Sequence, residues 1–377
     1  MTSTSPWFRL PLSAMLPERP TYFTGSVLGP SAERALRAAY EEFGAPLGSG
    51  RAVWDSGARR AALNGSLLRP ADETLRRTAG DSGGGLSRLL GGGPGKRRAA
   101  LIAQTLADTP EVIARIERWW TRVRAMEWRQ ATVLQIMEEL EPRAEDALLA
   151  QAKIALGLAT AMQQQAGHIK SGPAGAVADL SAGIDVGLPA AGYTDVLHRL
   201  AAGLAGVDLS SAGGDWQQWP AALREPVDSF LSGYGRWSDE PLEIARPRWV
   251  EDPSALLAAL PDPAAGVGLA EASRRRAAAA AGISGQLGGS QRKQFDAATG
   301  QVQQLAALLP RIHESVVIVA AAARYWVSGA AGEALADGRL EAADEVFLLE
   351  LEELKQMMTG EWSNLEQVRP IVEARKQ

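Results

Sequence analysis

The sequence contains no cysteine and only three histidines, His168, His198 and His313. Without cysteine the chain can form no disulfide, thiolate nucleophile, cysteine-ligated zinc site or iron–sulfur cluster. The histidines follow no HxxxH or HExxH spacing, so a metal site would have to draw most of its ligands from carboxylates. A Gly-x-Ser-x-Gly motif is also missing, and so few histidines leave little material for a Ser-His-Asp triad. Hydrolase chemistry is therefore disfavoured, and we expect no metal site.

An excess of charge of one sign is missing too. Lysine and arginine number 39 against 44 acids, for a net charge of −5. The basic runs 96–98 and 274–276 are short, and each is predicted to be a solvated helix face rather than a polyanion site. No basic segment followed by an apolar one opens the chain, and no window approaches about 18 consecutive apolar residues. We therefore expect a cytoplasmic protein that binds neither nucleic acid nor membranes.

Hydrophobic periodicity predicts an all-α fold, an irregular multi-helix bundle with long antiparallel helices and little or no sheet. Repeated prolines predict an extended leader over 1–30. Helices are expected at 31–43, 109–140, 145–168, 176–184, 195–205, 225–233, 269–281 and 291–336, with two more within 340–376. The second begins at Thr109-Pro110 and ends before Pro142, so the second and third should form an antiparallel hairpin. A short strand could lie within 51–68. The region 31–377 divides into two expected lobes, 31–208 and 209–377.

A glycine-rich stretch covers 81–95 and invites comparison with a phosphate-binding loop. That motif needs a glycine at the place of Leu90 and a serine or threonine at the place of Arg97, so the match fails. We interpret the stretch as a flexible connector and expect no cofactor to be bound by this chain.

The segment 233–253 combines glycines, arginines and acids with Trp237 and Trp249. Flexible backbone, stacking surfaces and fixed charges are typical of a recognition loop. A structural loop anchored by the two tryptophans explains the same composition, and both interpretations stay open. A second candidate is His313-Glu314, at the start of an apolar helix segment that also carries Arg324, where charged groups would face an internal cavity.

Two motifs carry a resemblance to a known family. Tyr234-Gly235 leads through an acidic stretch into Pro247-Arg248-Trp249, and Gly338-Arg339-Leu340 leads into the segments 344–349 and 352–354, with 64–68 as a weaker third match. At these places the chain resembles the helical middle region of proteins related to phosphoenolpyruvate synthase, including rifampicin phosphotransferase and phenylphosphate-synthase-like enzymes. The matches span roughly residues 60 to 360 and thus most of the chain.

The resemblance implies one part of a three-part phosphotransferase. An ATP-grasp protein, with its ATP and magnesium, would phosphorylate a histidine on a swivelling domain, which would deliver the phosphoryl group to a substrate held by the helical part. Neither the ATP-grasp part nor the histidine domain occurs in this sequence, so we expect no phosphotransfer by this chain alone. The family's histidine and arginine after Tyr234-Gly235 are replaced by Arg236 and Trp237, and its acid by Pro241.

The leading hypothesis is a substrate-binding helical subunit that positions a small hydroxylated compound, aromatic compounds included. The expected catalytic proton acceptors are Glu243 or His313 with Glu314. The expected substrate-binding residues are Tyr234, Arg236, Trp237, Arg248, Trp249 and Arg324. Replacing Arg248 with alanine should abolish transfer and spare the fold. The alternatives are a diverged ligand-binding or scaffold protein and a stand-alone enzyme that lost its phosphotransfer partners.

Overall fold

A computed structural model describes residues 12–55, 60–79, 94–126, 130–169, 179–180, 190–209, 212, 215–262, 268–362 and 365–376. The helices are η1 (Leu12–Ala14), α1 (Tyr22–Glu42), α2 (Gly65–Ala79), α4 (Pro94–Ala125), α5 (Gln130–Gly167), α7 (Ala191–Gly203), η4 (Trp216–Gln218), α8 (Ala221–Tyr234), α9 (Pro253–Ala258), α10 (Gly268–Gln286), α11 (Gly289–Ala336), η6 (Ala343–Leu348), α12 (Leu351–Thr359) and α13 (Leu365–Lys376). In these ranges the sheet is limited to one antiparallel pair, β1 (Trp54–Asp55) with β2 (Arg60–Ala61). The expected all-α fold is confirmed, and the short strands lie within the predicted interval.

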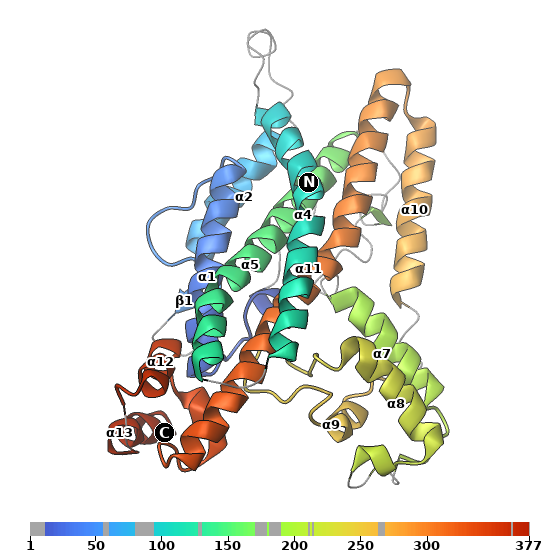
Figure 1. Cartoon of the computed structure of the whole chain (residues 1–377). Coiled ribbons are helices and arrows are strands. Elements are labelled where there is room, and N and C mark those ends of the chain that lie inside the picture. The colour runs from blue at the N-terminus through green and yellow to red at the C-terminus, as the bar shows by residue number, and fades with distance from the viewer. Residues whose placement is uncertain are drawn as a thin grey trace.

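The centre of the fold is α11, which packs along α5 and α4, while α1 packs on the other side of α5 (Figure 1). From Ile312 to Trp326 nearly every α11 side chain is buried, and small alanines there let neighbouring helices approach closely. Among the described helices α11 alone is long and apolar enough to cross a membrane, and 72% of its most apolar window is buried inside the protein. That burial is what a core helix shows.

The break between the two long antiparallel helices lies elsewhere than predicted. Thr109-Pro110 falls inside α4 and Pro142 inside α5, while the chain turns between Ala125 and Gln130. The Thr109 hydroxyl donates to the carbonyl of Thr105 at 2.6 Å instead of capping a helix start. Tertiary packing on α11 and α1 outweighs the local cost of a proline within a helix. The predicted boundaries were wrong, whereas the pairing of the two helices is confirmed.

The predicted leader over 1–30 was wrong for its last residues, because α1 begins at Tyr22 and runs through Pro30. Thr21 caps this helix, since its hydroxyl accepts a hydrogen bond from the Thr24 N–H. Upstream, Met15 and Leu16 are buried in the core. Burial of these apolar side chains, together with the cap, stabilises the helix start. Residues 1–11 lie outside the described ranges.

One predicted solvated basic run is partly buried. Arg98 is only 4% exposed, and it donates to the carbonyls of Phe43 at 3.0 Å and Leu75 at 3.2 Å. Phe43 is the C-cap of α1, so Arg98 satisfies a carbonyl that a helix end leaves unpaired. Of the glycine-rich stretch 81–95, residues 81–93 lie outside the described ranges, while Pro94 and Gly95 begin α4 instead of belonging to a connector. Most of the expected helix 176–184 also lies outside the described ranges.

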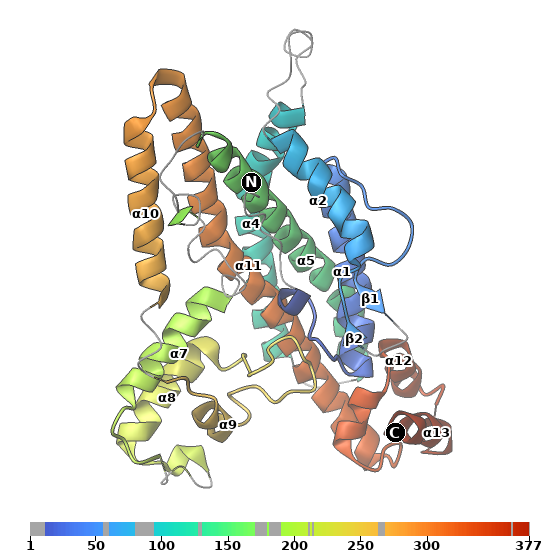
Figure 2. The same cartoon turned by 180° about the vertical axis from the view of Figure 1, so that it is seen from behind.

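The shorter helices gather at one end of the bundle. Figures 1 and 2 show α7, α8 and α9 on one side of the lower end and α12 and α13 on the other. Within the first group, the segment 235–252 connects α8 to α9 and has no regular helix. One hydrophobic cluster contains residues from both expected lobes, and the lobe boundary at 208/209 stays a prediction.

Candidate functional site

The segment 235–252 is closed at its base by Gly235. The Gly235 carbonyl accepts from the Val250 N–H at 2.9 Å, and the Trp237 carbonyl accepts from the Trp249 N–H at 2.8 Å. A Cβ atom at position 235 would lie 2.5 Å from the Leu231 carbonyl oxygen and 3.1 Å from the Val250 Cβ. Only glycine permits this approach, which explains a glycine at this place of the motif. We name this segment the 235–252 loop.

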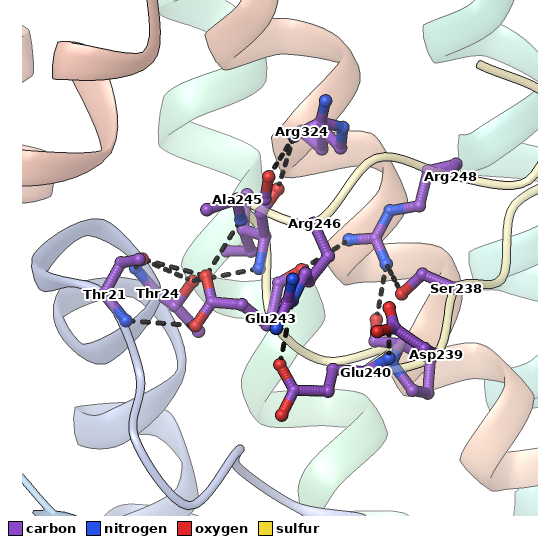
Figure 3. A network of polar contacts seen from close by, with 12 residues as sticks. Thr21, Thr24, Ser238, Asp239, Glu240, Glu243, Ala245, Arg246, Arg248 and Arg324 are labelled. Atoms are coloured by element: carbon purple, nitrogen blue, oxygen red, sulfur yellow. Dashed lines mark hydrogen bonds and ion pairs between the residues drawn. The ribbon is translucent and has the colours of Figure 1, made fainter. Parts of the chain in front are cut away.

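Glu243 joins the loop to the start of α1, as Figure 3 shows. Its buried carboxylate accepts from the Thr21 N–H at 3.0 Å, the Thr21 hydroxyl at 2.9 Å, the Thr24 hydroxyl at 2.6 Å and the Ala245 N–H at 2.8 Å. The Thr24 hydroxyl oxygen in turn accepts from the Ile244 N–H at 2.9 Å. A negative charge at a helix N-terminus is also favoured by the helix dipole. The proton-acceptor role expected of Glu243 stays a prediction; its observed contacts hold the loop on α1.

Arg248 lies inside the loop and is only 2% exposed. Its guanidinium donates to the Pro241 carbonyl at 2.8 Å, the Glu243 carbonyl at 3.4 Å and the Ser238 hydroxyl at 3.4 Å. Burial lowers its pKa to about 9, and the like charge of Arg324 adds to this shift. Removing such a side chain leaves buried acceptors without donors. Loss of Arg248 should therefore disturb the loop, contrary to the expectation that the fold is spared.

Arg324 fixes the loop from the side of α11 (Figure 3). Its Nε lies 2.9 and 2.8 Å from the two Glu251 carboxylate oxygens. Its Nη1 donates to the carbonyls of Ile244 at 3.1 Å and Ala245 at 2.7 Å. A planar guanidinium can make all these bonds at once. Arg324 thus binds protein groups at two separate places in the second half of the loop.

An aromatic cluster covers the other side of the loop. Tyr193 of α7 stacks on Trp237 with ring centroids 4.1 Å apart and an angle of 5° between the planes, and Tyr234 lies against both rings. The Trp249 indole N–H donates to the Tyr193 hydroxyl at 3.0 Å. Burial raises the pKa of Tyr193 to about 12. Trp237 and Trp249 are each only 2% exposed, so Trp237 stacks on a protein ring and Trp249 donates to a protein hydroxyl.

His313 and Glu314 diverge into different surroundings. The His313 ring meets Trp237 edge to face, with centroids 5.9 Å apart, and its Nδ1 lies 3.3 Å from Gln151 Oε1. Burial lowers the pKa of His313 to about 4, so the imidazole is neutral at pH 7. Glu314 forms an ion pair with Arg236 instead, and burial lowers the pKa of that arginine.

A cleft of about 730 Å³ lies next to this network, between α1, Glu141 of α5 and the start of α12. Its α1 wall contains Gly25, Ser26 and Gly29, which are spaced so that small residues share one helix face. We name it the α1–α12 cleft. The residues that line it include none of the nine candidate residues but do include Thr21, which binds Glu243. Its volume is in the range of small-molecule sites.

The nine candidate residues therefore meet around the 235–252 loop, and the cleft lies at its α1 anchor. Sequence reasoning missed Thr21, Thr24, Tyr193 and Glu251, because their partners are distant in sequence and no local pattern marks them. In the described part of the chain no group of three or more histidine, aspartate or glutamate side chains is placed to hold a metal ion. No protein-family model matches this chain, and no curated protein does either.

Proposed function

We propose that this chain is the substrate-binding helical part of a phosphotransferase of the phosphoenolpyruvate-synthase type. It would hold a small hydroxylated compound in the α1–α12 cleft and present its hydroxyl to a phosphohistidine domain. An ATP-grasp partner with ATP and magnesium would charge that domain, and the assembly would be cytoplasmic. The net products would be the phosphorylated compound, AMP and phosphate.

The observation that carries this proposal is that Thr21 belongs both to the cleft lining and to the hydrogen-bond network of the 235–252 loop. Thr21 lines the cleft, and both its N–H and its hydroxyl bind the Glu243 carboxylate within the motif that carries the family resemblance. The buried motif residues would then act as positioning residues. They hold the start of α1, and with it one wall of the cleft, in place.

Phosphoryl transfer suits a site of this kind, because its loose transition state needs positioning and charge stabilisation more than covalent help from the protein. Arg51 is exposed at the cleft and would face the incoming phosphoryl group. Under this proposal Glu243, Arg248 and Arg324 shape the site without touching the substrate.

The test begins with an affinity pull-down of the full chain from extract of its own cells, followed by mass spectrometry. Recovery of an ATP-grasp protein and a histidine-domain protein is the expected result. The recovered proteins are then combined with ATP and a panel of hydroxylated compounds, and AMP release is measured with and without this chain. Release that does not depend on this chain would refute the proposal.

The alternative is a diverged ligand-binding or scaffold protein. It is favoured by Arg236, which occupies the place of the family's histidine and forms an ion pair with Glu314, so its charge is already used within the protein. Under this alternative the pull-down retains neither partner, and a ligand binds tightly in the absence of ATP.

A further inference from the structure

We infer that the α1–α12 cleft takes an amine-bearing hydroxylated compound, whose ammonium group pairs with Glu141. This inference rests on the proposed function only in taking the cleft as the ligand site. It adds the charge of the ligand, which the family resemblance leaves open. The charged groups that line the cleft divide into those already neutralised within the protein and those that are not.

The helix N-termini at the cleft do not provide an anion site, although helix starts commonly do. The start of α1 is occupied by the Glu243 carboxylate, which accepts from the Thr21 N–H. At the start of α12, Glu350 and Glu353 form a capping box, and the Leu351 N–H donates to the Ser26 hydroxyl at 2.9 Å. The protein's own acceptors therefore already satisfy N–H groups at both helix ends.

Most of the charged side chains that line the cleft also have protein partners. Glu33 accepts from Arg37 at 2.6 Å and from the N–H groups of Ala52 and Val53. Arg34 lies 2.7 Å from Glu145, and Glu352 lies 2.5 Å from Lys355. Their charges are balanced before any ligand enters.

Glu350, the remaining acid of the α12 wall, lies 3.6 Å from Arg375. Two charged lining groups are then left, Glu141 and Arg51, and within the described ranges neither side chain has a hydrogen bond or ion pair. Glu141 is half-buried and Arg51 is exposed. A partly desolvated carboxylate binds a counter-ion more strongly than an exposed arginine does. The cleft therefore favours a cation.

The cleft also offers apolar surface for the body of such a ligand. Pro20, Tyr22, Pro30 and Leu351 contribute to its walls, and apolar walls with a few convergent polar groups are typical of small-molecule sites. An aromatic or cyclic compound with one ammonium group and one hydroxyl matches this combination.

The test uses three probes that share a phenol ring and differ in charge: tyramine, 4-ethylphenol and 4-hydroxyphenylacetate. Their dissociation constants for the full chain are measured by ligand-observed NMR. Tyramine should bind about tenfold more tightly than 4-ethylphenol, as one charge-assisted contact provides, and 4-hydroxyphenylacetate should bind most weakly. Glu141→Gln should remove the preference for tyramine.

Glu138→Gln is the matched control, because it removes the same charge one turn away on α5, at an exposed residue outside the cleft lining. It should keep the wild-type preference. Equal binding of the three probes, tightest binding of the acid, loss of the preference in the control or no binding by any probe would each overturn the inference. The proposed function is tested separately by dependence of AMP release on this chain, so the two can fail independently.

Discussion

Glu243 should be the most sensitive acidic position in the 235–252 loop. In Glu243→Gln the amide oxygen can keep the three donors at Oε1, but the amide NH₂ then faces the Thr21 N–H, which donates to Oε2. One buried donor loses its acceptor, and the remaining bonds lose their charge assistance. Together these losses should cost about 2–4 kcal/mol.

The unfolding entropy of a chain of 377 residues implies a fall in Tm of about 1.3 °C per kcal/mol, so Tm should drop by about 3–5 °C. Urea denaturation followed by circular dichroism gives the free energy, and thermal melting gives Tm. Glu240→Gln is the matched control, since Glu240 pairs with Arg246 on the surface of the same loop. This variant should change the free energy of unfolding by no more than about 0.5 kcal/mol. A Glu243→Gln variant as stable as wild type, or a control that is equally destabilised, would refute the anchoring role.

Three further predictions use the same loop and its neighbours. Arg324→Lys cannot reproduce the paired contacts to Glu251 and two carbonyls, and it should lower the free energy of unfolding by about 1–3 kcal/mol in urea titrations. Tyr193→Phe removes the acceptor of the buried Trp249 N–H, and it should cost about 1–3 kcal/mol with a shifted tryptophan emission. Burial lowers the pKa of His313 to about 4, against about 6.5 in the unfolded chain, so between these pH values only the unfolded chain binds a proton at His313. The free energy of unfolding should therefore fall by up to about 1.4 kcal/mol per pH unit as the pH drops through this window. His313→Gln should flatten this dependence of stability on pH.

Each of these predictions has a control of the same residue type. Arg246→Lys changes an exposed arginine of the loop, and Tyr234→Phe alters another ring of the aromatic cluster. His198→Gln removes a half-buried histidine of α7. A control that behaves like its partner variant would show that the effect does not come from the named contact.

Local patterns predicted which parts of the chain are helical better than they predicted where helices end. The apolar run of α11 and the two amphipathic C-terminal helices follow from periodicity alone. Thr109-Pro110 has the features of a helix start and yet lies inside α4. There, packing on neighbouring helices outweighs a local signal worth only a few kcal/mol.

The sequence by itself determined the all-α class, the absence of cysteine chemistry and the concentration of unusual residues in 235–252, because composition and periodicity are local properties. Only the tertiary structure decided what those residues contact. Glu243 meets Thr21 and Thr24 across more than 200 positions, and Arg248 is enclosed by its own loop. The cleft likewise could not be predicted from the sequence, since α1, α5 and α12 form its walls only when they pack together. Burial then makes these side chains partners of protein groups: the Glu243 and Arg248 charges and the Trp249 indole N–H all form hydrogen bonds within the protein, because polar groups taken out of water are costly to leave unpaired.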